Sequence, residues 1–330
     1  MIEFAQFGAG RIGRIHAAAI AASGKARLRY VVDVNAKAAA ELAASYGAKA
    51  VDTKTAMSDP KVGAVLIASS TDTHADLTIA AAKAGKAIFC EKPIDLSLAR
   101  VDACLKVVKA AKVPMLVGFN RRFDPSFASL HARLRAGEIG DVEQVIVSSR
   151  DPGLPPFEYL KVSGGQFRDM TIHDFDMARW LLGEEPNEVF AFGSALVDPR
   201  VAKAGDIDSA MVLLRTRSGK MAHINNSRRA SYGYDQRIEV HGSKGRLMAG
   251  NHTPTTVEKA DASSVSTDKP LYFFLERYAA AYRAEMDAFL TALTTKKKMP
   301  VGADDGRKAL VLAEAALKSS KTGKPVKVSL

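Results

Sequence analysis

A carboxylate and a histidine, Asp169 and His173, have a spacing suited to proton transfer. They are four positions apart just after Gly164-Gly165, so on a helix beginning there both side chains would project from one face. Histidine is the natural proton acceptor near neutral pH, and a carboxylate one turn earlier can orient its ring or bind a substrate hydroxyl. Alternatively, the pair only complements the dipole of a helix N-terminus. Asp174 and Asp176 are weaker candidates, because their spacings from the histidine are less favourable.

Lys92 supplies a cation that the oxidation of an alcohol also requires. It follows the apolar run 87–90 within Glu91-Lys92-Pro93 and is therefore expected at the carboxyl end of a strand. An ammonium group there can stabilise the alkoxide that develops as a hydride leaves. A lysine at a strand end is also a common surface charge, so its role depends on the other candidates. The predicted catalytic set is Lys92, Asp169 and His173.

A glycine-rich turn near the start of the chain predicts a dinucleotide site. The pattern G-x-G-x-x-G follows the apolar run 1–7 and leads into an Ala-rich helical stretch at 12–22. Its first glycine permits the tight turn, the second lets a pyrophosphate approach the backbone, and the third lets the helix pack on the strand. A turn that packs but binds nothing is the alternative. The residues of this predicted turn are Gly8, Gly10, Arg11, Ile12 and Gly13.

Asp33 predicts NAD rather than NADP as the cofactor. It ends the strand expected at 27–34, about 20 residues after the turn, where a carboxylate accepts the ribose hydroxyls and repels a 2′-phosphate. Lys37 lies nearby and leaves NADP open. Small polar residues end the strand expected at 64–69, and they either border the cofactor or cap the helix expected at 75–84. The predicted cofactor contacts outside the turn are Asp33, Ser69, Ser70, Thr71, Glu91 and Lys92.

Two different patterns of periodicity predict two domains. Strands and helices alternate up to about residue 120, which favours an α/β Rossmann domain with a doubly wound parallel sheet. Beyond it, strand-like runs follow one another, which favours an α+β domain with a large, mostly antiparallel sheet open on at least one face. The predicted domains are 1–120 for the dinucleotide and 121–330 for the substrate. Helices are expected at 125–136, 171–182, 274–294 and 306–319, and a polar loop at 249–269.

Composition argues against several other classes of protein. The net charge is +11, but the basic residues are spread along the chain, which argues against nucleic-acid binding. No apolar run approaches a membrane-spanning length, and no signal peptide is recognisable. Cys90 and Cys104 have no C-x-x-C partner, and the remaining histidines share no ligand spacing, so neither a disulfide nor a metal is expected. Cytoplasmic residence fits these features best.

Four stretches together resemble the Gfo/Idh/MocA family of nicotinamide-dependent sugar and polyol oxidoreductases, over nearly the whole chain. They are GAGRIGRIHA at 8–17, EKP at 91–93, GFNRRFDP at 118–125 and RDMTIHDFDMARWL at 168–181. The resemblance implies that His173 is the acid/base and that Lys92 supports the substrate hydroxyl, with Asp169 completing the catalytic set. It also implies subunit contacts through the open face of the C-terminal sheet, and hence a homotetramer or homodimer.

Two further stretches, SSRDP at 148–152 and YGYDQRIEVHGSKG at 232–245, resemble the inositol-oxidising branch of this family. A ring with six hydroxyls needs dense hydrogen bonding, since buried polar groups demand partners. Tyr234 and Asp235, however, could equally cap a strand. The predicted substrate contacts are Lys92, Asn120, Arg150, Asp151, Asp169, His173, Tyr234 and Asp235.

The expected reaction is NAD-dependent oxidation of a secondary hydroxyl of a cyclic polyol to a ketone, with myo-inositol and its 2-keto product as the leading pair. An aldopyranose or anhydrosugar dehydrogenase is the first alternative, because the catalytic set does not encode which ring is presented. A catalytically silent NAD-binding sensor is the second alternative.

Overall fold

The computed structural model describes all 330 residues and divides into two compact units. The first unit comprises Met1–Phe123 and Ala280–Leu310, and the second comprises Asp124–Ala279 and Val311–Leu330. The domains expected from the sequence, 1–120 and 121–330, are consecutive stretches and do not include this return of the chain. None of the helices is both long enough and apolar enough to cross a membrane.

The first unit is built on a six-stranded parallel sheet of order β3-β2-β1-β4-β5-β6, which confirms the predicted Rossmann domain. Its strands are β1 (Ile2–Phe7), β2 (Ala26–Val32), β3 (Lys49–Ala50), β4 (Val62–Ile67), β5 (Ala87–Glu91) and β6 (Met115–Gly118). Its connecting helices are α1 (Arg11–Ala22), α2 (Ala36–Ser45), α3 (Thr53–Ser58), α4 (Thr71–Lys83) and α5 (Leu98–Ala111). Because the strands are parallel, their carboxyl ends lie at one edge of the sheet.

Helix α12 (Ala279–Thr295) belongs to the core of the first unit although it lies far along the chain. Phe289 is fully buried, and its ring centroid lies 6.0 Å from that of Phe4 and 5.6 Å from that of Phe89. Burial of this apolar surface attaches the helix to the strands. The single helix expected at 274–294 is two helices, α11 (Phe274–Arg277) and α12. The sequence predicted where the helical stretch lies along the chain, but not that it packs on the first unit.

The second unit contains a seven-stranded sheet of order β12-β11-β7-β10-β9-β8-β15. Its strands are β7 (Val142–Arg150), β8 (Pro186–Ser194), β9 (Ser209–Thr216), β10 (Met221–Ser227), β11 (Asp235–Gly242), β12 (Gly245–Ala249) and β15 (Val326–Lys327). All neighbours are antiparallel except β10 and β7, which confirms the predicted mostly antiparallel sheet.

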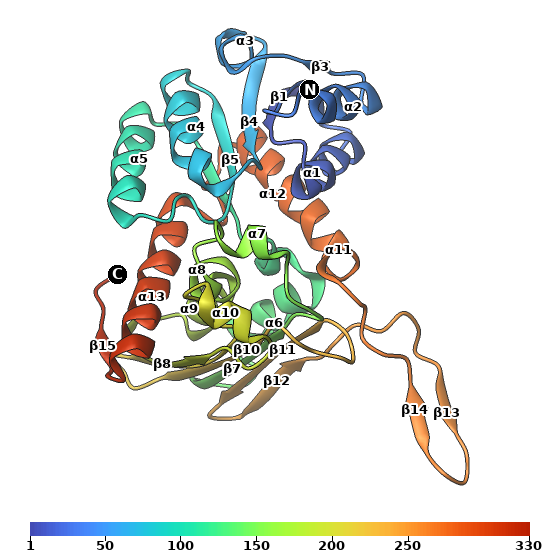
Figure 1. Cartoon of the computed structure of the whole chain (residues 1–330), viewed down its shortest axis with the longest axis vertical. Helices are drawn as coiled ribbons and strands as arrows, with labels where there is room; N and C mark the ends of the chain where they lie inside the picture. The colour runs from blue at the N-terminus through green and yellow to red at the C-terminus, as the bar shows by residue number, and fades with distance from the viewer. The chain divides into compact units, whose positions relative to one another are not determined.

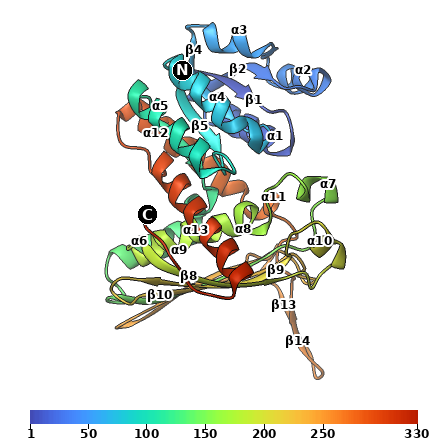
Figure 2. The ribbon, with the colours of Figure 1, turned by 60° about the vertical axis from the view of Figure 1, so that its left-hand side comes forward.

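Helices cover only one face of this sheet. Figures 1 and 2 show α6 (Pro125–Arg135) and α9 (Thr171–Leu182) on the same side of it. In β9 the residues Val212 and Leu214 are buried, whereas the alternate residues Met211 and Leu213 are more than half exposed. The sheet is therefore open on the other face. The unit's remaining helices are α7 (Phe157–Leu160), α8 (Gln166–Asp169) and α10 (Pro199–Lys203), and α13 (Ala303–Thr322) reaches it near the end of the chain.

A two-stranded hairpin occupies the stretch 249–269 that was expected to be a loop. Its strands β13 (Glu258–Ala260) and β14 (Val265–Thr267) pair only with each other, and all their residues are exposed. The hairpin projects from the second unit beyond the open face of the sheet (Figures 1 and 2).

Candidate active site

In the turn between β1 and α1, the backbone packs so closely that two of the three glycine positions have no room for a side chain. A Cβ atom on Gly8, whose φ is +103°, would lie 2.3 Å from the carbonyl oxygen of Ala68. A Cβ atom on Gly13 would lie 2.1 Å from the carbonyl oxygen of Gly8. Gly10, the N-cap residue of α1, has no such constraint, because a Cβ there meets no atom within 4 Å. This open approach to a helix N-terminus fits the pyrophosphate of a dinucleotide.

The buried side chain of Gln6 holds this turn together, and the sequence analysis missed it. Its Nε2 donates hydrogen bonds of 2.8 Å to the carbonyl oxygens of both Gly8 and Gly13. The only signal in the sequence was a polar residue within an otherwise apolar strand. The other two residues predicted for the turn open α1, where Arg11 is exposed and Ile12 packs on the core.

Asp33 follows β2 and is bonded to the glycine turn. Its Oδ2 accepts a hydrogen bond of 2.6 Å from the backbone nitrogen of Ala9, and its Oδ1 accepts one of 2.8 Å from that of Asn35. An ionised carboxylate has about four acceptor positions, so the two ribose hydroxyls of NAD find acceptors on an already oriented group. Lys37 is exposed in the first turn of α2.

The polar residues after β4 do not cap the following helix with their side chains. Helix α4 begins at Thr71, earlier than expected, with Ser70 as its N-cap residue. The Ser70 side chain makes no capping hydrogen bond, and the Ser69 hydroxyl is 2.6 Å from that of Thr73. Capping therefore does not account for the exposed Ser70 hydroxyl, and a contact with the cofactor stays a prediction.

Lys92 directly follows β5 and is half-buried, beside a carboxylate held from α1. The Glu91 Oε1 atom lies 2.6 Å from Nε2 of the fully buried His16, and its Oε2 accepts a 3.3 Å hydrogen bond from the Lys92 backbone nitrogen. A Cβ atom on Gly118 would lie 2.9 Å from this carboxylate, so the glycine leaves room for it. The sequence analysis had treated His16 as structural; here its ring orients the glutamate next to the candidate lysine.

The predicted residues of the first unit lie at the carboxyl edge of its sheet. Asn120 is buried in the short 3₁₀ helix η1 (Asn120–Phe123) that follows β6. His74 connects two neighbouring strand ends, with Nδ1 2.8 Å from the carbonyl oxygen of Pro93 and Nε2 3.1 Å from that of Ser69. This edge is where open α/β sheets bind their ligands.

In the second unit, Asp169 and His173 come from two consecutive helices rather than from one. Asp169 ends α8, and His173 lies in the first turn of α9, after Met170. The backbone nitrogen of His173 bonds to the carbonyl oxygen of Met170 at 3.3 Å, a tighter turn than the i to i−4 pattern of an α-helix. The chain thus bends between the two side chains, and both are only partly buried.

Two side chains that the sequence analysis did not select bind the Asp169 carboxylate. The Tyr159 hydroxyl donates to Oδ1 at 2.7 Å, and Nη2 of Arg228 donates to Oδ2 at 3.1 Å. Burial and the negative charge of the aspartate raise the pKa of Tyr159, so the phenol stays protonated. Neither residue belongs to a recognisable local motif, because both are distant from Asp169 in the sequence.

The alternative carboxylates Asp174 and Asp176 are buried and engaged within the unit. Asp174 Oδ2 accepts a 2.8 Å hydrogen bond from Asn226 of β10, and Asp176 is 3.6 Å from Nη1 of Arg179. They are 0% and 1% exposed, so they attach α9 to its surroundings and have no access to a ligand. Asp169 remains the better candidate of the three.

The residues predicted to contact the substrate in the second unit are not all brought together. Asp151 lies near the Asp169 group, since its charge acts on both Arg228 and Tyr159. Arg150 ends β7 on the same face as the exposed alternate residues of that strand. Its Nε donates to Asn225 at 2.9 Å on the open face of the sheet, which is the face opposite α9. The structure thus separates it from the Asp169 group.

Tyr234 is buried among aromatic side chains, and its contact with a substrate stays a prediction. Its side chain is 6% exposed, and its ring packs edge to face against Phe273 and Tyr278. Strand β11 begins at the next residue, Asp235, whose carboxylate binds Tyr232 at 2.6 Å. These contacts fit the alternative interpretation, in which the two residues stabilise the start of a strand.

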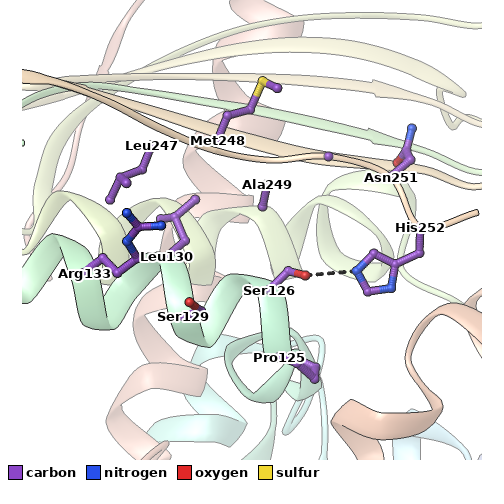
Figure 3. A pocket seen from close by; sticks show the side chains of 11 residues that line it. Pro125, Ser126, Ser129, Leu130, Arg133, Leu247, Met248, Ala249, Asn251 and His252 are labelled. Atoms are coloured by element: carbon purple, nitrogen blue, oxygen red, sulfur yellow. Dashed lines mark hydrogen bonds between the residues drawn. The ribbon is translucent and has the colours of Figure 1, made fainter. Parts of the chain in front are cut away.

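A pocket of about 480 Å³ lies between α6 and the end of β12 and contains no predicted site residue (Figure 3). Its Ser126 hydroxyl is 2.9 Å from Nε2 of His252, whose pKa is lowered by burial and by the charge of Arg277. Arg133 on its wall is paired with Glu138 at 2.7 Å. Its polar groups are largely satisfied internally, so it does not compete with the predicted site.

The chain combines a Rossmann sheet, whose glycine turn opens toward a helix N-terminus, with an α+β unit that bears a carboxylate and a histidine. This combination is typical of an NAD-dependent oxidoreductase. The family model described as "Oxidoreductase family, NAD-binding Rossmann fold" matches residues 2–119, and "Oxidoreductase family, C-terminal alpha/beta domain" matches residues 131–328. The chain belongs to the Gfo/Idh/MocA family.

Full-length relatives support this assignment. The chain is 51% identical over 321 residues to an inositol 2-dehydrogenase of Rhizobium meliloti, covering 96% of each chain. It is 47% identical over 323 residues to a myo-inositol 2-dehydrogenase of Thermotoga maritima, covering 97% of each. The crystal structure of a myo-inositol dehydrogenase from Corynebacterium glutamicum superposes with a TM-score of 0.96 at 43% identity, covering 100% of this chain and 99% of that one. The predicted family, fold and NAD cofactor are confirmed.

Replacing Gly10 by Ala tests the phosphate-binding role of the turn. We expect NAD affinity to fall by about tenfold or more, because the methyl group occupies the approach to the helix N-terminus. The thermal midpoint should hardly change, since a Cβ at this position meets no neighbouring atom. Titration calorimetry and thermal unfolding measure the two quantities. Gly13→Ala is the matched control and should lower stability; unchanged NAD affinity in Gly10→Ala would contradict the assignment.

Proposed function

We propose that this protein oxidises a secondary hydroxyl of a cyclic polyol with NAD, converting myo-inositol to 2-keto-myo-inositol. The observation that carries the choice of substrate is the similarity along the whole chain to two inositol 2-dehydrogenases, at 51% and 47% identity. A further relative of known structure, a scyllo-inositol dehydrogenase of Lactobacillus casei with bound NAD(H) and scyllo-inositol, has a TM-score of 0.92 at 28% identity and covers 99% of each chain.

In the proposed mechanism, the glycine turn and Asp33 hold NAD, which supplies the hydride acceptor when it is bound. His173 accepts the proton of the substrate hydroxyl. The Lys92 ammonium group donates to the hydroxyl oxygen and stabilises the negative charge that develops there. Asp169 binds a neighbouring substrate hydroxyl or supports the imidazolium as it forms. Asn120 and Asp151 are the remaining candidates for hydrogen bonds to the ring.

A panel of substrates tests the proposed function. We expect NADH production, followed at 340 nm, with myo-inositol and NAD, and slower turnover with D-glucose, D-galactose and levoglucosan. NADP should be a poor substitute because the Asp33 carboxylate repels a 2′-phosphate. Preference for a pyranose or anhydrosugar would support the proposed oxidation of a secondary hydroxyl but contradict inositol as the substrate. Tight NAD binding without turnover of any polyol or sugar would instead support the silent sensor.

Replacing His173 by Ala tests the acid/base assignment. We expect kcat to fall by about 100-fold or more, because general-base catalysis is lost, while NAD affinity is retained. Steady-state kinetics and NAD titration of the same preparation separate the two effects. Unaltered turnover would exclude the role, and a parallel loss of NAD binding would indicate misfolding instead.

We also propose that the open face of the seven-stranded sheet binds a second copy of this chain. Apolar side chains gather at its exposed alternate positions, where a contiguous apolar patch is typical of an interface. They are Ile146, Phe192, Met211, Leu213, Met221 and Met248, exposed by 39% to 64%. The fully exposed hairpin of β13 and β14 projects on this side, and an isolated hairpin is marginally stable in water without further packing.

Leu213→Asp tests this interface. A charge in the centre of the patch should dissociate the assembly into smaller species, because a buried unpaired carboxylate is costly. Light scattering coupled to size-exclusion chromatography measures the mass. Ala103→Asp, at an exposed position of α5 in the first unit, is the matched control and should leave the mass unchanged. A monomeric wild-type protein, or a variant of unchanged mass, would contradict the proposal.

A further inference from the structure

Both oxygens of the Asp169 carboxylate are bound by side chains from distant parts of the second unit. Tyr159 of α7 donates to one oxygen at 2.7 Å, and Arg228, which follows β10, donates to the other at 3.1 Å. Asp169 is the last residue of the four-residue helix α8, and neither donor belongs to that helix. These two donors therefore select its orientation.

Arg228 is suited to hold a carboxylate in a fixed position. It is only 2% exposed, and its backbone nitrogen is bonded to the carbonyl oxygen of Asp208 at 2.8 Å. Burial by itself lowers the pKa of Arg228, but the carboxylates of Asp169, Asp151 and Asp206 outweigh it, and the net effect is to raise it. The guanidinium thus stays charged in a buried setting, where charge-assisted hydrogen bonds are short and strong.

Tyr159 adds a neutral donor to this charged one. The residue is 45% exposed, whereas its hydroxyl donates a hydrogen bond to Asp169. Hydrogen bonds donated to the ionised form of a carboxyl group favour that form, so both donors oppose protonation of the aspartate. Besides Asp169, the charges that act on these donors are Asp151, which acts on both Tyr159 and Arg228, and Asp206, which acts on Arg228. His173 lies four residues along the chain from Asp169.

We propose that Tyr159 and Arg228 are positioning residues that keep Asp169 ionised and oriented for its work beside His173. This inference rests on the proposed function, in which Asp169 and His173 act on the substrate. An ionised carboxylate has about four acceptor positions, so one group can serve its positioning donors and a substrate hydroxyl or the imidazolium. The two donors act through Asp169 and need no contact with the substrate.

Tyr159→Phe removes the hydroxyl and keeps the ring. We expect the titration midpoint of the Asp169 carboxyl group to move to higher pH by about 0.5 to 1 unit, because the aspartate loses a donor to its ionised form. The kcat value should fall by about three- to tenfold, with NAD affinity unchanged. Tyr272→Phe, at a residue 69% exposed, is the control and should reproduce the wild-type values.

Arg228→Lys is the second variant, because removal of the buried charge could prevent folding. Lysine retains the charge but not the planar geometry of the guanidinium. The kcat value should again fall with little change in NAD affinity, whereas a purely structural role would lower the thermal midpoint and leave kcat of the folded enzyme unaltered. Wild-type kcat in both folded variants would overturn the inference.

A measurement without substrate separates this inference from the proposed function. In protein labelled with ¹³C at the aspartate carboxyl carbon, the resonance lost in Asp169→Asn identifies Asp169. Its NMR titration midpoint should rise in Tyr159→Phe and stay constant in Tyr272→Phe. Absence of inositol turnover by the wild type would then refute the substrate and leave this test intact, while an unchanged midpoint in Tyr159→Phe would refute the positioning role whatever the substrate.

Discussion

The first unit depends on a close approach of two backbone segments, the turn after β1 and the end of β4. The carbonyl oxygen of Ala68 occupies the place that a side chain on Gly8 would need. The carbonyl oxygen of Gly8 likewise occupies the place that a side chain on Gly13 would need. With both side chains absent, α1 packs on the sheet and its N-terminus faces the carboxyl edge. The buried amide of Gln6 satisfies the carbonyl groups that this compact turn leaves inside. The open space at Gly10 is a consequence of the same geometry.

The second unit achieves precision in another way. Asp169 ends the four-residue helix α8, whereas His173 lies in the first turn of α9. Orientation comes instead from side chains: Tyr159 and Arg228 hold the aspartate, while the buried Asp174 attaches α9 to β10. Carboxylates only a few residues apart thus lie in different surroundings, since Asp169 is partly exposed and Asp174 is fully buried.

Local patterns predicted much of the fold. The helix expected at 171–182 is α9 at the same bounds, and the alternation of strand and helix up to residue 120 corresponds to the Rossmann sheet. Side-chain periodicity carries this information because the neighbours that decide it are a few residues away. The place of α12 was not predictable in the same way, since its apolar face fits a core made by strands within residues 2–118.

The sequence by itself determined the fold class, the glycine turn with its ribose carboxylate, and the candidate trio Lys92, Asp169 and His173, because spacing along the chain encodes each of them. Tertiary structure alone decided which of the other polar residues are buried and which are exposed. Strand alternation placed Arg150 on the open face, and packing against Phe273 placed Tyr234 among aromatic rings. It also decided what surrounds Asp169, because hydrogen-bond partners 10 and 59 residues away are selected by folding and not by sequence separation.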